Sequence, residues 1–136
     1  MSGGVLVDSN VLLDLFEEDP VWYDWSANQL QQLADSASPL IINTVIYAEV
    51  SVGFERIEEL EAVLRPEFFE RRPIPWEAAF LAGKCFLRYR KQGGVRSSPL
   101  PDFFIGAHAA VEKLTLLTRD AARYRSYFPT LTMIAP

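Results

Sequence analysis

Short apolar runs alternate along this chain with segments of helical pattern, and this alternation constrains the fold more than any other feature. The runs Val5-Leu6-Val7 and Leu40-Ile41-Ile42 are typical of buried β-strands. Strands that alternate with helices form a parallel sheet covered by helices. The sequence therefore predicts an α/β protein.

The boundaries of the elements follow from these patterns and from helix-capping residues. Strands are expected at residues 4–8, 39–43, 68–73 (a weak one), 115–117 and 131–134. Helices are expected at residues 21–36, 45–54, 56–64, 76–92 and 103–111, with a short helix ending near Asp19-Pro20 and a helical turn ending at Tyr124. Ser9 or Asn10 is expected to cap the first helix, and Thr44 the helix at 45–54. Residues 93–99 read as a loop rich in Gly and Ser.

The helix expected at residues 76–92 carries one broad apolar face. Its members are Ala79, Phe80, Ala82, Gly83, Phe86, Leu87 and Tyr89. Cys85, the only cysteine, lies in the same apolar pattern. A single cysteine fits a reducing compartment and is expected to be a buried structural thiol.

Length and composition bound the class of protein. A chain of 136 residues with 49% hydrophobic content is expected to form one globular domain over residues 1–136. No apolar run approaches the roughly 20 residues of a membrane helix. The N-terminus lacks the basic region of a signal peptide. We therefore expect a cytoplasmic protein with no membrane partner.

Four carboxylates stand at strand ends or near helix starts. Asp8 and Asp120 follow strand-like runs, Asp102 opens a helix, and Glu49 lies one turn into another. In a parallel α/β sheet these positions share the edge at the carboxyl ends of the strands, where such folds place their ligands. Gathered carboxylates repel one another unless a positive group joins them. Their oxygen atoms suit a hard divalent cation such as Mg²⁺ or Mn²⁺.

Each acid also has a purely structural explanation. Asp102 can favour the positive end of its helix dipole, and Asp120 can be an N-cap. Glu49 can be a surface residue and Asp8 a turn former. A shared site accounts for all four placements together, whereas the structural explanations need four coincidences. Gly106, one turn after Asp102, permits either close approach of a ligand or helix–sheet packing.

Other polar residues are expected to be structural. His108, the only histidine, follows Asp102 by six residues, roughly 240° round an ideal helix, so it should point away from the acids. Four further acids are expected to form a solvated helix end: Asp14, Glu17, Glu18 and Asp19.

The net charge of −5 is unevenly distributed. The first 55 residues hold nine acids and no Lys or Arg, whereas the remainder holds nine acids and 13 bases. One stretch of bases has no intervening acid: Lys84, Arg88, Arg90, Lys91 and Arg96. This asymmetry fits an acidic site beside a basic rim for a nucleic-acid backbone, and equally a solvated helix face with a charged loop.

Four segments carry a resemblance to a known family. They are VLVDSNVLLDLF, NTVIYAEV, LPDFFIGAHA and LLTRDAARYRSYFP, in this order along the chain. They resemble the successive motifs of PIN-domain nucleases, most of all the toxin subunits of VapBC type II toxin–antitoxin pairs. The resemblance implies a three-layer α/β/α fold, with a short parallel sheet of four to five strands flanked by helices. It also implies cleavage of single-stranded or looped RNA, a cognate VapB-like antitoxin and a toxin homodimer.

The same resemblance implies the residues of the site. The family's acids fall on Asp8, Glu49, Asp102 and Asp120. Its polar helpers fall on Ser9 or Asn10 and on Thr118.

The chemistry of phosphodiester hydrolysis assigns roles to these residues. The reaction needs an activated water and neutralisation of phosphate charge, which one or two Mg²⁺ or Mn²⁺ ions supply. Asp8 and Asp120 are expected to bind the metal directly, and Asp102 and Glu49 directly or through water. One of the latter two can accept the proton of the water.

The polar helpers and two arginines complete the expected site. Asn10 and Thr118 can orient a carboxylate or a water molecule. Arg119 and Arg96 are candidates for contact with substrate phosphate, although Arg119 can instead form a surface ion pair.

Trp22, Tyr23 and Trp25 cluster at the start of the second helix. Adjacent aromatic residues cannot all face one core stripe, so some are expected to be exposed and to form a protein interface. In the resembling family the antitoxin packs near these early helices. Ordinary core packing of two of the three is the alternative.

Two other functions stay open at this point. A haloacid-dehalogenase-like phosphatase also places an Asp after its first strand but needs a second Asp two residues on, where this chain has Asn10. A catalytically silent PIN-type module that binds RNA or protein would keep the fold without turnover. The complete set of four acids argues against such a module.

Overall fold

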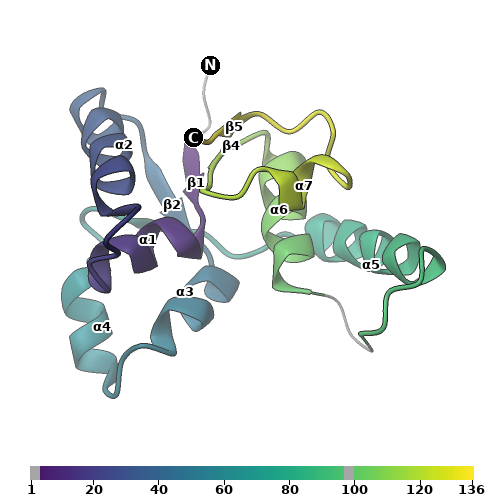
Figure 1. Ribbon diagram of the computed structural model, residues 1–136, viewed down its shortest axis with the longest axis horizontal. Helices are drawn as coiled ribbons and strands as arrows, with labels where there is room; N and C mark the ends of the chain where they lie inside the picture. The colour runs from purple at the N-terminus through teal and green to yellow at the C-terminus, as the bar shows by residue number, and fades with distance from the viewer. Residues whose placement is uncertain (1–3, 97–99) are drawn as a thin grey trace.

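The computed structural model describes residues 4–96 and 100–136 and is built around a parallel sheet (Figure 1). The five strands lie in the order β3-β2-β1-β4-β5, and every neighbouring pair is parallel. Their bounds are Val5–Val7 (β1), Leu40–Ile42 (β2), Glu70–Arg71 (β3), Thr115–Leu117 (β4) and Met133–Ile134 (β5). The predicted α/β class and the predicted number of strands are therefore confirmed.

Helices flank the sheet and complete the three-layer α/β/α arrangement. They are α1 (Ser9–Phe16), α2 (Tyr23–Asp35), α3 (Thr44–Ser51), α4 (Ile57–Val63), α5 (Trp76–Lys91), α6 (Pro101–Glu112) and α7 (Ala122–Arg125). In Figure 1, α1, α2 and α4 lie on the left of β1, α3 lies below it, and α5 to α7 lie on its right. None of the helices in the described ranges is long and apolar enough to cross a membrane.

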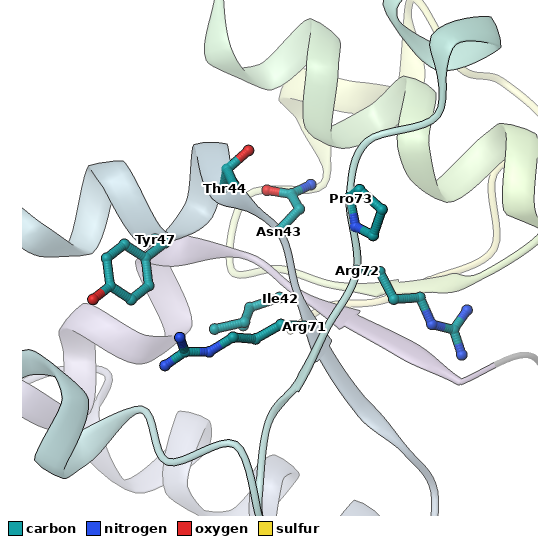
Figure 2. Close-up of a pocket in the computed structure, with 7 residues that line it drawn as sticks. All are labelled: Ile42, Asn43, Thr44, Tyr47, Arg71, Arg72 and Pro73. Atoms are coloured by element: carbon teal, nitrogen blue, oxygen red, sulfur yellow. The ribbon is translucent and has the colours of Figure 1, made fainter.

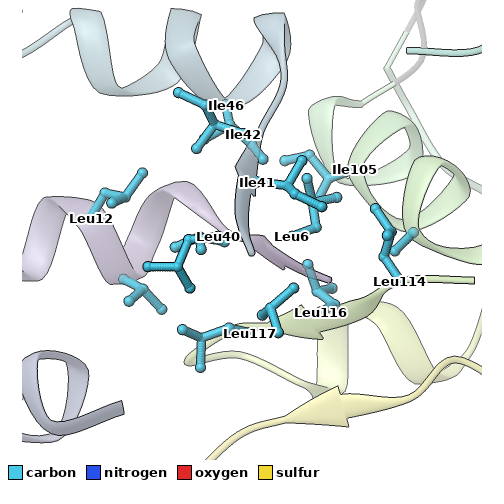
Figure 3. Packing of buried hydrophobic residues seen from close by; sticks show 14 of the residues in the cluster. Leu6, Leu12, Leu40, Ile41, Ile42, Ile46, Ile105, Leu114, Leu116 and Leu117 are labelled. Atoms are coloured by element: carbon cyan, nitrogen blue, oxygen red, sulfur yellow. The ribbon is translucent and has the colours of Figure 1, made fainter. Parts of the chain in front are cut away.

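The core lies on both faces of the sheet. Residues of β1, β2 and β4 such as Leu6, Ile41 and Leu116 are fully buried. Figure 3 shows these side chains near Ile105 of α6, whereas Leu12 of α1 lies on the other side of the strands. Because both faces are covered, the strands are continuous apolar runs and do not alternate with polar residues.

Two helix caps differ from the sequence prediction. Asp8, not Ser9 or Asn10, caps α1, and its Oδ1 accepts a hydrogen bond from the Ser9 amide at 2.8 Å. Asn43, not Thr44, caps α3, and its Oδ1 accepts from the Ile46 amide at 2.9 Å. In both cases the residue directly after the strand has an extended backbone and caps the helix. The strand therefore passes directly into the helix.

Several boundaries are also tighter than predicted. The strands expected at 68–73 and 131–134 shorten to β3 and β5, because only those residues pair with a neighbour. The first helix ends at Phe16, before Asp19. The loop expected at 93–99 includes residues 97–99, which lie outside the described residues.

The apolar face predicted for α5 was wrong in part. The buried residues are Ala78, Ala82 and Cys85, whereas Phe80 and Leu87 are 69% and 47% exposed. Small side chains at this spacing let α5 approach α6 closely, which leaves Phe80 and Leu87 on the other side. The prediction of a buried thiol at Cys85 is confirmed.

Candidate active site

Asp8 lies at the carboxyl end of β1 and is almost completely buried. Its Oδ1 accepts from the Ser9 amide, and its Oδ2 accepts from two hydroxyl groups. These are Thr118 Oγ1 and the hydroxyl of Tyr124, each at 2.8 Å. Hydrogen bonds to both oxygens hold this carboxylate in one orientation.

Glu49 joins Asp8 through a serine. Ser9 Oγ donates to Glu49 Oε1 at 2.8 Å and lies 3.5 Å from Asp8 Oδ1. Glu49 reaches this position from the last turn of α3, while Ser9 opens α1. The strand end and the neighbouring helix therefore bring two of the predicted acids together.

Asp102 and Asp120 complete the acidic cluster from α6 and from the turn after β4. The Tyr124 hydroxyl lies 3.4 Å from Asp102 Oδ1. Arg123 lies between the two acids, with Nη1 at 3.6 Å from Asp102 Oδ2 and Nε at 2.7 Å from Asp120 Oδ2. All four predicted acids thus belong to one connected network at the carboxyl edge of the sheet.

The predicted polar helpers brace this network. Thr118 Oγ1 donates to Asp8 and accepts from the Asp120 amide at 3.0 Å and from Asn10 Nδ2 at 3.4 Å. Asn10 Oδ1 in turn accepts from the Arg119 amide at 3.2 Å. These bonds tie the start of α1 to the turn that carries Asp120.

Tyr124 and Arg123 were missed by the sequence reasoning. Tyr124 is fully buried and contacts both Asp8 and Asp102, and Arg123 is the arginine nearest to the acids. A signal was present, because the two residues stand three and four positions after Asp120 in a helical turn. At that spacing side chains return to the same face of a helix.

The environment disfavours the charged form of three acids. Burial raises the pKa of Asp8, and the charge of Asp102 raises it further. Burial raises the pKa of Glu49, with the charges of Asp8 and Asp102 adding to it. Burial also raises the pKa of Asp102, although Arg123 partly opposes this, and Asp120 adds repulsion. A bound cation would relieve the repulsion.

The pKa of Tyr124 is also raised, first by burial and then by the charges of Asp8 and Asp102. Its hydroxyl therefore keeps its proton and acts as a donor to the carboxylates.

The cluster fits a divalent cation in donor chemistry and in charge. Its donors are carboxylate oxygens, which hard cations prefer. Within residues 4–96 and 100–136, no three side chains of His, Cys, Asp or Glu already converge as a cage. Arg123, which is exposed, supplies positive charge between Asp102 and Asp120.

Asp14 differs from its predicted place, and Arg119 has a structural partner in it. Asp14 is buried, not solvated, and accepts from Ser26 Oγ at 2.7 Å and from Arg119 Nε and Nη2, both at 3.0 Å. Arg119 also lies over the ring of Trp22 at 5.6 Å. Its charge therefore stabilises a buried carboxylate inside the fold, and its expected contact with substrate stays a prediction.

Arg96 lies in the loop that follows α5. Its amide donates to the Tyr89 hydroxyl at 3.4 Å, beyond the end of α5. Neither Arg96 nor Arg119 makes a hydrogen bond or ion pair with the four acids in the described part of the chain.

His108 points away from the acids, as predicted. It is fully buried, with Nδ1 at 3.0 Å from Asn43 Nδ2 and Nε2 at 3.0 Å from Glu112 Oε1. Because the Asn43 amide is a donor, Nδ1 accepts and Nε2 carries the proton towards Glu112. Both ring nitrogens therefore form hydrogen bonds within the fold, and these bonds help to hold α6 in place.

The aromatic cluster at the start of α2 is divided between core and surface. Trp25 packs against the core, and Trp22 meets it edge-on at 6.2 Å. Tyr23 is exposed, as expected for at least one of the three.

Comparisons with known proteins agree with the fold. The model of the PIN domain family matches residues 5–128, so the chain belongs to this family. VapBC2 from Rickettsia felis bound to a DNA fragment from its promoter has a similar structure, with a TM-score of 0.73 and 20% identity over 97% of this chain and 98% of that one. VapBC-1 from nontypeable Haemophilus influenzae has a TM-score of 0.70 and 18% identity over 96% of each chain.

A third similar structure is FitAcB from Neisseria gonorrhoeae, with a TM-score of 0.66 and 18% identity over 96% of each chain. At these identities the likeness is one of fold. No curated protein sequence matches the chain significantly.

Proposed function

We propose that this protein is a metal-dependent endoribonuclease and the toxin of a toxin–antitoxin pair, acting in the cytoplasm. The observation that carries the proposal is the network in which Asp8, Glu49, Asp102 and Asp120 meet at one sheet edge. The PIN family membership and the similarity to structures titled VapBC and FitAcB support it.

The residues divide the work of phosphodiester hydrolysis. Asp8, Asp102 and Asp120 would hold Mg²⁺ or Mn²⁺, with Glu49 as a further ligand, direct or through water. The ion, when bound, neutralises charge on the phosphate and helps to activate water. Thr118 and Tyr124 keep Asp8 in its orientation. Glu49, whose pKa burial raises, is suited to accept a proton from the attacking water.

Arg123 is the proposed contact for substrate phosphate. It is exposed and already faces two acids, so its guanidinium can turn from Asp120 towards a bound phosphate. Unlike Arg119 and Arg96, the two arginines first expected to contact substrate, Arg123 forms ion pairs with acids of the site.

The start of α2 is the proposed surface for a VapB-like antitoxin. Val21 and Tyr23 are exposed there, beside half-buried Trp22. The first 55 residues contain nine acids and no Lys or Arg, so a partner with basic side chains would be complementary in charge.

The outer side of α5 is the proposed surface for homodimer formation. Trp76, Phe80 and Leu87 form an exposed apolar stripe on it, and Trp76 is 89% exposed. Glu77 lies in the first turn of α5 and Arg88 and Lys91 in the last. An antiparallel pair related by a two-fold axis would place these opposite charges against each other.

The first test is cleavage of a fluorescent single-stranded RNA with Mg²⁺, with Mn²⁺ or with chelator. We expect cleavage only with metal. Asp102→Asn and Asp120→Asn should each reduce kcat/KM at least about a hundredfold, roughly 2.7 kcal/mol of transition-state stabilisation. Glu17→Gln is the matched control. It changes an exposed acid, the C-cap residue of α1, and should have little effect.

Thermal melts of the same variants separate metal binding from turnover. Metal should raise the melting temperature of the wild type and of Glu17→Gln, and raise it less in the two Asn variants. Equal metal stabilisation of all four proteins, or near-normal cleavage by the Asn variants, would rule out this assignment of the site. Metal binding without cleavage of any RNA would instead favour a silent module.

A further inference from the structure

A cavity of about 370 Å³ lies between the start of α3 and the segment that follows β3 (Figure 2). It is lined by Ile42, Asn43, Thr44, Tyr47, Arg71, Arg72 and Pro73. In Figure 2 Tyr47 and Pro73 stand on opposite sides, and Arg71 points towards the Tyr47 side. The volume is at the lower end of the roughly 300–1,000 Å³ of small-molecule sites, enough for one flat ring system.

The cavity opens at the same edge of the sheet as the acids. Asn43 follows β2, and Arg72 and Pro73 follow β3, just as Asp8 follows β1. The order β3-β2-β1 puts these positions one and two strand spacings from Asp8, about 5 and 10 Å. A ligand that crosses the acids can therefore also reach the cavity.

The charges around the cavity are already compensated. Arg71 Nη2 lies 2.9 Å from Glu61 Oε2. Arg72 lies 2.5 Å from Glu70 and 3.5 Å from Glu112. The lining of the cavity therefore suits an uncharged group with an apolar face better than a phosphate.

Tyr47 forms a platform that is fixed before any ligand binds. Its hydroxyl donates to Glu61 Oε2 at 2.6 Å, and the guanidinium of Arg71 lies 5.3 Å from its ring centroid. Glu61 thus holds both the tyrosine and the arginine. A ring held in this way loses little conformational freedom when a flat ligand stacks near it.

The polar edge of the cavity comes from α3. The hydroxyl of Thr44 is at the exposed rim. The first amides of a helix have no intrahelical acceptor, so the start of α3 can present donors to a ligand carbonyl. An apolar platform beside a few donors is the combination that recognises a nucleobase in single-stranded RNA.

We propose that this cavity binds the base of a nucleotide next to the scissile phosphate, stacked on the Tyr47–Arg71 pair with its polar edge towards Thr44. The inference rests on the proposed ribonuclease function and adds a subsite that sets sequence preference. Base stacking fixes the position of the strand, so the neighbouring phosphate is presented to the acids.

The experiment uses the full chain and short RNAs that differ only in one abasic nucleotide, placed in turn at each position around the mapped cleavage site. In the wild type, one abasic position should lower kcat/KM about tenfold, the loss of one stacked base. Tyr47→Leu should lose a similar factor on intact RNA and lose nothing further with that abasic RNA. Phe68→Leu, an exposed aromatic at the amino end of β3, is the matched control and should behave as the wild type.

A second readout needs no cleavage. Short RNAs carry 2-aminopurine at each position in turn, and one of them should lose fluorescence on binding the wild type in chelator, and not on binding Tyr47→Leu. The wild-type abasic and 2-aminopurine measurements decide the question even if Tyr47→Leu fails to fold.

Three results would overturn the subsite. They are equal effects of all abasic positions, additive losses from Tyr47→Leu and the abasic nucleotide, or normal RNA handling by Tyr47→Leu with weakened antitoxin binding. The last would assign the cavity to the protein partner. Failure of the wild type to cleave any RNA would contradict the proposed function itself, and the 2-aminopurine measurement would then decide the cavity alone.

Discussion

Asp8 illustrates how one side chain serves several purposes in this protein. It ends β1, caps α1 and stands at the centre of the acidic network. Its position needs little from distant sequence, because the strand end and the helix cap are adjacent residues. Its orientation needs Thr118 and Tyr124, which are 110 and 116 residues away.

Asp102 provides a prediction at the residue scale. Burial raises its pKa above the value of 3.8 expected for an exposed Asp. The folded protein therefore binds this proton more tightly than the unfolded chain does. The associated stability is present below the unfolded pKa and is lost as pH rises through the folded pKa.

In chelator, Asp102→Asn should therefore gain stability relative to the wild type as pH rises. The difference in melting temperature should be small or negative near pH 4 and become positive towards about pH 7, because Asn stays neutral. Melts at several pH values measure it, with Glu58→Gln as an exposed control that should show no such trend. A difference that falls with rising pH would contradict the shifted pKa.

The helices show how side-chain size decides packing at the scale of elements. α5 meets α6 through Ala78, Ala82 and Cys85. α6 meets the C-terminal segment at Gly106, where an added Cβ would overlap the buried ring of Phe128. Gly106 thus serves packing, but against Phe128 and not against the sheet as its sequence position suggested.

Replacement of glycine by alanine should have opposite effects on stability at two positions. Gly106→Ala should destabilise the protein by about 1–3 kcal/mol, because the Phe128 ring is buried and cannot yield freely. Gly83→Ala, on α5, places its Cβ where nothing lies within 4 Å and should stabilise by about 0.5–1 kcal/mol through helix propensity. Chemical denaturation measures both. Two changes of the same sign would contradict this account of the packing.

At the scale of the whole molecule, the exposed apolar stripe on α5 predicts self-association. Trp76→Ser combined with Phe80→Ser should shift the protein from dimer to monomer in sedimentation equilibrium. Val52→Ser, which changes an exposed apolar residue between α3 and α4, should leave the association unchanged. A dimer of unaltered affinity in the double variant would remove α5 from the interface.

Much of the fold and of the acidic site follows from sequence alone, because the relevant signals are local. Alternation of apolar runs with helical segments specifies a parallel sheet. Asp8 follows β1 directly, Asp120 lies in the turn after β4 and Asp102 lies in a first helical turn, so the common sheet edge places them. The direction of His108 likewise follows from helical geometry.

What only the tertiary structure decided depends on contacts between distant segments. The bond of Arg119 to Asp14 spans 105 residues and turns an apparently solvated acid into a buried one. α5 has apolar residues on two sides, and only the close approach of α6 selects the side with small residues. Tyr124 reaches Asp8 only because the chain after β4 folds back over α6. The periodicity of the local sequence does not predict these contacts, because they form only once the sheet has placed its strands side by side.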